Sequence, residues 1–114
     1  MDAEAFDALV AQAVEGLPQW VHEALDNVEL FTEDFPPPGQ QALLGIYQGI
    51  PLTKRGNHYT GALPDRITLY RSTLWRAAGR DPERLGPLVA HTVEHELAHH
   101  FGISDDRLRE LGAY

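Results

Sequence analysis

The sequence predicts an α+β fold with helices at both ends and a small twisted sheet between them. Two observations support this fold class. Apolar residues recur at helical spacing near both ends of the chain, whereas residues 28–31, 43–52 and 67–70 have the composition or alternation of strands. The 114 residues suffice for one modest core, so we expect residues 1–114 to form a single domain.

The first half of the chain begins with two predicted helices. Asp2 can cap the first helix and Pro18 follows its end, while residues 20–25 suit a second, shorter helix. In the first helix, apolar side chains recur at helical spacing: Phe6, Leu9, Val10, Ala13 and Leu17. The prolines at 36–38 must form a loop between the first two strands, because proline cannot donate to a ladder. Residues 53–63, polar and glycine-rich, are predicted to form the next loop.

A long helix is predicted in the last third of the chain. A short helical turn over 74–78 precedes it, and Asp81 followed by proline resembles a cap with a first-turn proline. We expect the long helix to begin within residues 82–87 and to run to about Phe101. Gly102 is well placed to end it.

The protein carries a formal net charge of −8 and no cysteine. The negative charge argues against a nucleic-acid partner, because phosphate contacts need a basic face. Without cysteine, any bound metal must be held by His, Asp or Glu. No apolar run approaches the roughly 20 residues that span a bilayer, and the acidic segment Met1–Glu4 lacks the basic region of a signal peptide. We therefore expect a cytoplasmic protein that binds neither nucleic acid nor membrane.

The long helix carries the pattern H-E-x-x-H at residues 95–99. His95 and His99 are four residues apart and share one helical face, separated by a rise of about 6 Å. Their rings can converge on one ion at about 2.0–2.1 Å from each nitrogen. Glu96 points to the side of this pair, where it can contact a water on the metal. The pattern therefore predicts one zinc ion bound by His95 and His99, with Glu96 as the catalytic base.

A third ligand is expected just after this helix. Gly102 allows a sharp turn that can bring Asp105 back beneath the two imidazoles, so that three protein ligands and a water complete a tetrahedral site. Two other carboxylates are alternatives. Asp106 fits better as a first-turn acid of a last short helix over 104–111, and Glu110 on that helix is expected to face solvent.

The remaining histidines are not expected to bind this ion. His91 and His99 are about 12 Å apart along the helix axis, so one ion cannot reach His91, His95 and His99 together. We expect His91 to lie beside the site or to face solvent. His100 points about 100° away from His99 and is expected to be exposed or packed. We assign no role to His22 or His58.

Residues 95–105 resemble the extended motif H-E-x-x-H-x-x-G-x-x-D. The chain as a whole is similar to the minimal zincin family of small bacterial zinc metallopeptidases, and the similarity extends to residues 44–47, 49–52 and 63–70. It implies a zincin-like fold, in which a mixed sheet packs against the active-site helix and one edge strand lines the cleft. One feature departs from the related metzincins: Met1 is the only methionine, so their methionine turn is missing.

By matching position, the resemblance implies His95, His99 and Asp105 as zinc ligands and Glu96 as the catalytic glutamate. The expected function is zinc-dependent hydrolysis of peptide bonds in a peptide or protein substrate, which could pair with the edge strand around 44–50. The alternatives are a non-catalytic zinc-binding module and a degenerate peptidase scaffold used for protein interaction. The sequence leaves open the oligomeric state and which of three tyrosines stabilises the oxyanion: Tyr47, Tyr59 or Tyr70.

Overall fold

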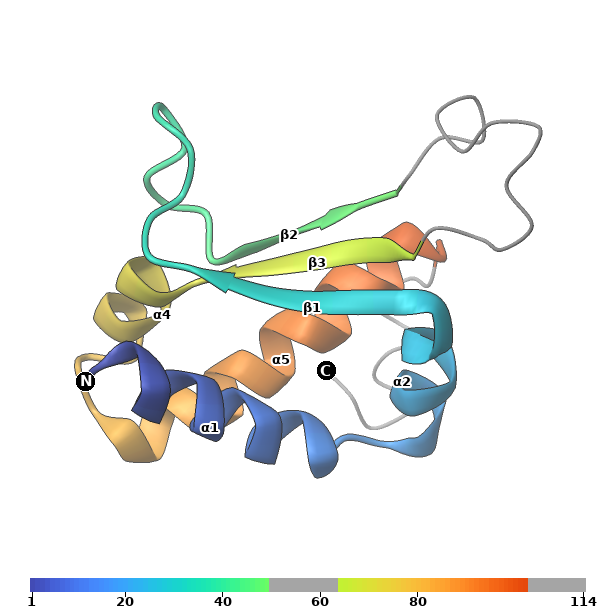
Figure 1. The fold of residues 1–114 in the computed structure, drawn as a ribbon, viewed down its shortest axis with the longest axis horizontal. Coiled ribbons are helices and arrows are strands. Elements are labelled where there is room, and N and C mark those ends of the chain that lie inside the picture. The colour runs from blue at the N-terminus through green and yellow to red at the C-terminus, as the bar shows by residue number, and fades with distance from the viewer. Residues whose placement is uncertain (50–63, 103–114) are drawn as a thin grey trace.

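A computed structural model describes residues 1–49 and 64–102 of the chain. Helices cover one face of a three-stranded sheet, which confirms the predicted α+β class (Figure 1). The elements in chain order are α1 (Ala3–Glu15), α2 (Gln19–Ala24), the 3-10 turn η1 (Leu25–Asn27), β1 (Val28–Glu33), β2 (Gly45–Gln48), β3 (Asp65–Tyr70), α4 (Arg71–Ala77) and α5 (Pro82–His100).

The sheet is mixed, with the strand order β1-β3-β2. The parallel pair β1 and β3 is in register from Val28 opposite Asp65 to Glu33 opposite Tyr70. The antiparallel pair β2 and β3 places Gly45 opposite Leu69. Among the described strands, the last in sequence is therefore the central one, and β2 lies at an edge, where it contacts α5.

Both long helices begin as the sequence predicts. The Asp2 carboxylate accepts a hydrogen bond from the Ala5 N–H at 2.7 Å, and the Asp81 carboxylate accepts one from the Glu83 N–H at 2.9 Å. Such caps satisfy amide groups that have no partner within the helix. Helix α5 is followed by Gly102, whose φ of +71° is the left-handed conformation expected of a terminal glycine.

Two element boundaries differ from the prediction. Helix α4 begins at Arg71, directly after β3, rather than near residue 74. Its first residues are polar and are fixed by tertiary contacts: Arg71 bonds Asp34 at 2.8 Å and Thr32 at 2.7 Å. The predicted strand over 43–52 forms β2 only over Gly45–Gln48 within the described residues. The loop predicted over 53–63 and the helix predicted over 104–111 lie outside the described residues.

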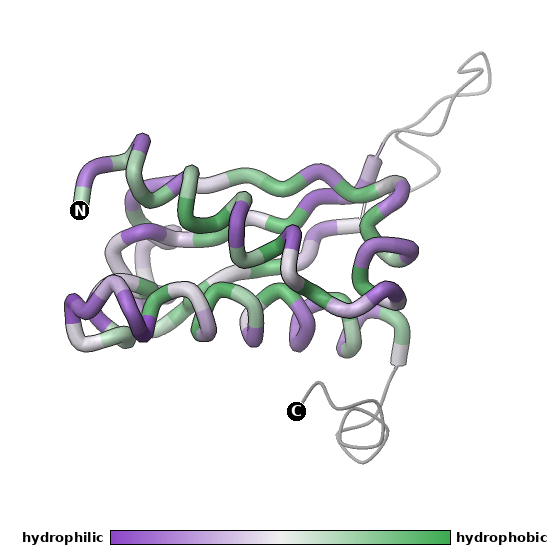
Figure 2. Tube along the Cα trace, turned by 90° about the horizontal axis from the view of Figure 1, so that it is seen from below, coloured by the Kyte–Doolittle hydropathy of each residue, from purple (hydrophilic) through white to green (hydrophobic). Residues whose placement is uncertain are grey.

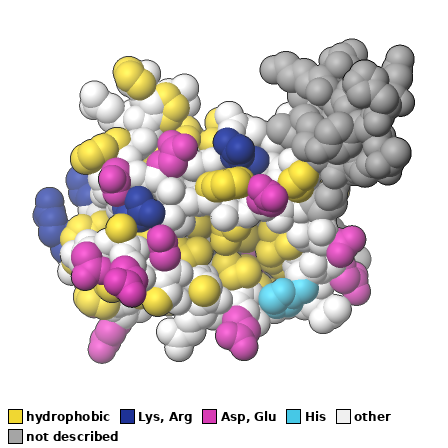
Figure 3. All heavy atoms as spheres, in the orientation of Figure 1, with side chains coloured by type: hydrophobic (Ala, Val, Ile, Leu, Met, Phe, Trp, Pro, Cys, Tyr) yellow, Lys and Arg dark blue, Asp and Glu magenta, His cyan; other side chains and the backbone are white. Residues whose placement is uncertain are grey.

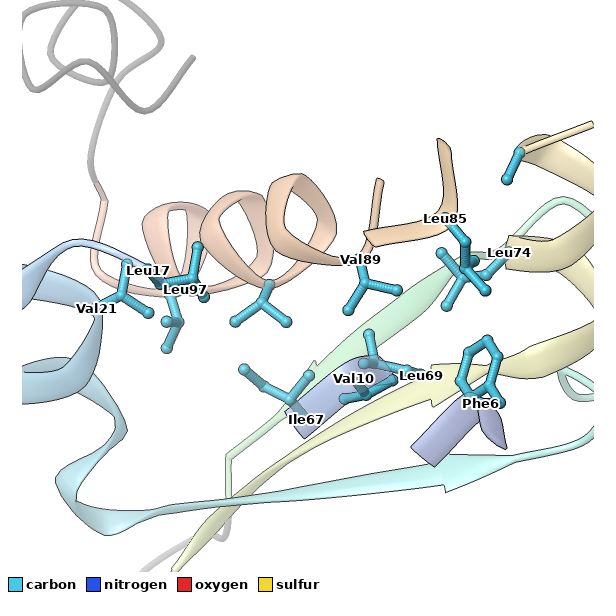
Figure 4. Close-up of a cluster of buried hydrophobic side chains, with 12 residues drawn as sticks. Phe6, Val10, Leu17, Val21, Ile67, Leu69, Leu74, Leu85, Val89 and Leu97 are labelled. Carbon is cyan, nitrogen blue, oxygen red and sulfur yellow. The ribbon is translucent and has the colours of Figure 1, made fainter. Parts of the chain in front are cut away.

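The core lies between the sheet and the helices, with the long helices α1 and α5 in contact with each other (Figure 2). In the close-up, Phe6, Leu74 and Leu85 meet at one end of this layer (Figure 4). The other end is formed by Leu17 from the turn between α1 and α2, Val21 from α2 and Leu97 from α5. The front face shows further hydrophobic side chains between β1 and α1 (Figure 3), where a hollow of about 270 Å³ has a partly apolar lining.

Helix α5 packs on the sheet through one regular stripe. The stripe is spaced by four residues and each member is fully buried: Leu85, Val89, Val93 and Leu97. Residues offset by two positions from this stripe lie about 200° away around the helix. His91, His95 and His99 have that offset, so burial of the apolar stripe turns the histidines away from the core. Within residues 1–49 and 64–102, no helix combines the length and apolar character needed to cross a membrane.

Candidate metal centre

Three histidines line one face of α5. The ring centroids of His95 and His99 are 5.5 Å apart, with an interplanar angle of 83°. His95 is half-buried and its Nε2 atom is buried, whereas His99 is exposed. His91 is exposed, and its ring lies against that of His95 at 4.1 Å between centroids. The structure therefore brings the two predicted ligands together and leaves His91 beside them, facing solvent.

These histidines open onto a cleft of about 280 Å³ between α5 and the segment that leads into β2. The cleft is lined by Ala42, Leu43, Leu44, Gly45, His91, Thr92, His95, Glu96 and His99. Its volume lies just below the range of about 300–1,000 Å³ that is typical of small-molecule sites. The cleft is large enough for an ion, a water and a small part of a substrate.

Glu96 is held in place by the edge strand. The backbone N–H of Tyr47 donates a hydrogen bond to Oε2 of Glu96 at 3.1 Å. Burial raises the pKa of the Glu96 carboxyl above its ordinary value, while the Tyr47 hydrogen bond and the nearby His99 act in the opposite direction. A raised pKa suits a general base, because proton transfer is most efficient when the pKa approaches the working pH.

The antiparallel pairing explains why the Tyr47 N–H faces the helix. The Tyr70 N–H donates to the Leu44 carbonyl at 3.0 Å, so Leu44 is turned toward β3. Backbone groups alternate along an antiparallel strand between the partner strand and the opposite edge. Gly45 and Tyr47 are therefore turned toward the open edge of β2. This edge of β2 thus offers backbone groups to the cleft.

Gly45 allows this close contact between strand and helix. A Cβ at this position would lie 3.0 Å from the Thr68 carbonyl oxygen, 3.0 Å from Leu69 Cδ2 and 3.2 Å from Thr92 Cγ2. These separations are shorter than ordinary van der Waals contacts, so a larger residue would push β2 away from both β3 and α5. Gly45 was not among the predicted site residues, because only the packed structure reveals its neighbours.

A second group of polar side chains anchors Tyr47 beside Glu96. The Tyr47 hydroxyl donates to Asp65 Oδ2 at 2.7 Å, and its ring stacks on His100 at 3.8 Å between centroids. His100 Nε2 lies 3.8 Å from Asp65 Oδ2. His100 is therefore both packed and partly exposed, in line with its predicted position on the helix. Asp65 was not among the predicted site residues, and its signals in the sequence were its place before the third strand and within the family-like segment 63–70.

The three tyrosines considered as oxyanion donors differ in their surroundings. The Tyr47 hydroxyl is directed to Asp65, and Tyr70 is only 3% exposed. Tyr59 lies outside the described residues. Neither described tyrosine lines the cleft that holds the histidines.

Two imidazoles on one helical face fit a zinc ion, which prefers nitrogen ligands in protein sites. In the part of the chain that the structure describes, no group of three or more His, Cys, Asp or Glu side chains could hold a metal ion. The predicted third ligand, Asp105, and its alternatives Asp106 and Glu110 lie outside the described residues. The zinc ligand set therefore stays a prediction.

The chain also matches a known protein family. The model of the zincin-like metallopeptidase family matches residues 25–113, a range that includes the sheet, α4, α5 and the H-E-x-x-H pattern. No curated protein matches the chain. The match covers well over half of the sequence and agrees with the mixed sheet packed on a histidine-bearing helix. The chain belongs to the zincin-like metallopeptidase family.

Proposed function

We propose that the protein is a zinc-dependent peptidase that hydrolyses peptide bonds with water. His95, His99 and Asp105 would hold one zinc ion, and Glu96 would act as the general base. The observation that carries this proposal is the position of Glu96, next to the paired histidines and hydrogen-bonded to the edge strand at 3.1 Å. A structural zinc module would have no need for a carboxylate held in this way.

A zinc ion bound there would act as a Lewis acid, lowering the pKa of its water toward about 7 and polarising the scissile carbonyl. Glu96 removes a proton from the attacking water as the new C–O bond forms. It then delivers that proton to the amine as the C–N bond breaks, so the carboxylate ends in its starting state. Because Oε2 accepts the Tyr47 hydrogen bond, we assign the proton to Oε1.

The substrate would lie in an extended conformation along the open edge of β2. The backbone N–H of Tyr47 is already used by Glu96 and Leu44 is turned toward β3, so pairing with the substrate would fall mainly on Gly45. Backbone pairing is largely independent of side-chain identity. A cleft of about 280 Å³ has too little surface to form a deep specificity pocket. We therefore expect weak activity or activity on a narrow range of substrates.

The test compares the zinc-loaded protein with its Glu96→Gln variant on a mixture of unstructured peptides, with products identified by mass spectrometry. Removal of a general base typically lowers the rate by about 100-fold or more. The control is Glu83→Gln, an exposed residue in the first turn of the same helix. It should cleave as the wild type does.

Zinc content must be measured on the same samples. A loss of cleavage in Glu96→Gln at full zinc content supports the proposal. Equal cleavage by Glu96→Gln and wild type would refute the role of Glu96. No cleavage by any zinc-loaded sample would favour the two alternatives, a non-catalytic zinc module or a degenerate scaffold. A fourth protein ligand on the metal would favour the zinc module.

A further inference from the structure

A second, larger groove runs between α1 and α5, away from the histidine cleft. Its volume is about 580 Å³, roughly twice that of the cleft, and none of its lining residues is shared with the cleft. Its walls include Leu9, Ala13, Leu17, Pro87, Ala90 and Glu94. We call it the α1–α5 groove.

Small residues on α5 create the α1–α5 groove. Gly86, Ala90 and Glu94 are spaced by four and lie on one face of the helix. A Cβ added at Gly86 would lie 3.9 Å from Leu9 of α1, which is an ordinary contact distance. The small side chains along this line leave the space that forms the groove, and Glu94 is the acidic residue among the groove's apolar walls.

The Glu94 side chain has no partner in the part of the protein that the structure describes. It is only 8% exposed, yet no hydrogen bond or ion pair reaches it from residues 1–49 and 64–102. Burial of a carboxylate without a partner is costly. By contrast, Glu96 accepts a hydrogen bond from the Tyr47 N–H, and Asp34 pairs with Arg71 at 2.8 Å. The groove therefore presents to whatever enters it a carboxyl group that no described residue pairs with.

A ligand complementary to the apolar walls and to Glu94 would carry a positive charge at the end of an apolar chain. A lysine side chain has this form, because its hydrocarbon stem can lie on apolar surface while the ammonium reaches a carboxylate. The net charge of −8 also favours the approach of a basic partner. A volume of about 580 Å³ exceeds what one lysine fills and leaves space for neighbouring apolar side chains.

We propose that the α1–α5 groove binds a peptide segment of a partner protein through a lysine that is flanked by apolar residues. The ammonium would pair with Glu94, and the flanking side chains would contact Leu9, Ala13 and Ala90. This binding requires neither zinc nor Glu96, so it holds or fails independently of the peptidase proposal.

The probe is the peptide acetyl-Ala-Leu-Lys-Leu-Ala-amide, titrated into the isotope-labelled full-length protein and followed by amide NMR. We expect shifts at the amides of Ala13, Gly86 and Ala90 and none at Tyr47. Glu94→Gln should weaken binding about tenfold or more, the usual loss for a charged hydrogen bond. Glu83→Gln is the matched control and should bind as the wild type does. Mass spectrometry verifies that the peptide stays intact, and thermal unfolding verifies that each variant folds.

Two further ligands separate the possible occupants. The same peptide with norleucine in place of lysine should bind as weakly as the lysine peptide binds to Glu94→Gln. Butylammonium alone should bind much more weakly than the peptide. Equal binding of the norleucine peptide, or of Glu94→Gln, would overturn the proposal. So would butylammonium binding as tightly as the peptide, which would indicate a site for small amines.

Discussion

The backbone N–H of Tyr47 donates a hydrogen bond to the Glu96 carboxylate at 3.1 Å, across 49 positions of the sequence. This bond joins the edge strand β2 to the helix that carries both predicted histidine ligands. The same contact therefore positions the carboxylate that is proposed to transfer the proton and the strand that is proposed to bind the substrate. A change that moves β2 relative to α5 should affect both.

Gly45→Ala should disturb this arrangement. The added Cβ would lie 3.0 Å from the Thr68 carbonyl oxygen, a backbone atom that cannot turn aside. Overpacking of this kind typically costs about 1–3 kcal/mol. We expect lower stability in urea unfolding, together with loss of peptide cleavage.

The control for Gly45→Ala is Gly16→Ala. Gly16 has a φ of −80°, and an added Cβ there would be 3.7 Å from its nearest neighbour. It should leave stability unchanged or raise it slightly. If Gly45→Ala were as stable as Gly16→Ala, the close approach of β2 and α5 would not be important for the fold.

Tyr47→Phe should reduce stability while largely preserving cleavage. The variant loses the 2.7 Å hydrogen bond to Asp65 but keeps the ring stacked on His100 and the backbone N–H that holds Glu96. Loss of one such hydrogen bond typically costs about 1 kcal/mol. Thermal unfolding and cleavage assays on the same zinc-loaded sample provide the measurement. Cleavage that disappears while zinc is retained would instead identify the Tyr47 hydroxyl as a donor to the oxyanion.

Asp105→Ala should lose zinc, whereas Asp106→Ala should keep it. The two residues are adjacent and carry the same charge, so a general electrostatic effect would appear in both variants. Metal analysis after dialysis is the direct measurement. Because an ion that binds only the folded state stabilises it, chelation should also lower the melting temperature of the wild type. Full zinc content in Asp105→Ala would mean that another residue is the third ligand.

The free energy of unfolding should contain a pH-dependent contribution from Glu94. Burial raises the pKa of the Glu94 carboxyl in the folded protein, so the folded state holds the proton more tightly than the unfolded chain. Stability from this group is therefore lost as pH rises from the unfolded pKa, about 4.3, through the higher folded pKa. Glu94→Gln has no carboxyl group to ionise at this position. Its free energy of unfolding should therefore rise relative to that of the wild type as pH increases through this range.

The measurement is urea unfolding of the wild type and Glu94→Gln from about pH 4 to about pH 8. Burial also raises the pKa of Glu96, but that contribution is common to both proteins and cancels in the difference. Glu83→Gln serves as the exposed control. A difference between Glu94→Gln and wild type that does not vary with pH would show that the Glu94 carboxyl is not shifted by burial.

Much of the fold was predictable because it depends on neighbours in sequence. The caps at Asp2 and Asp81 and the glycine after α5 follow from short-range hydrogen bonding and backbone sterics, and the structure has all three. Helix α4 was placed too late because Arg71 is held by side chains distant in sequence, Thr32 and Asp34. Such contacts leave no periodic signal.

The sequence by itself determined that His95 and His99 share a helical face with Glu96 beside them, because the turn of an α-helix sets those positions. It also determined the family, whose model matches residues 25–113. The tertiary structure decided what surrounds the H-E-x-x-H pattern: the Tyr47 bond to Glu96, the close approach at Gly45 and the burial of Glu94. These features depend on how β2 and α1 pack against α5, and packing between distant segments is set by shape and burial over the whole domain rather than by local spacing.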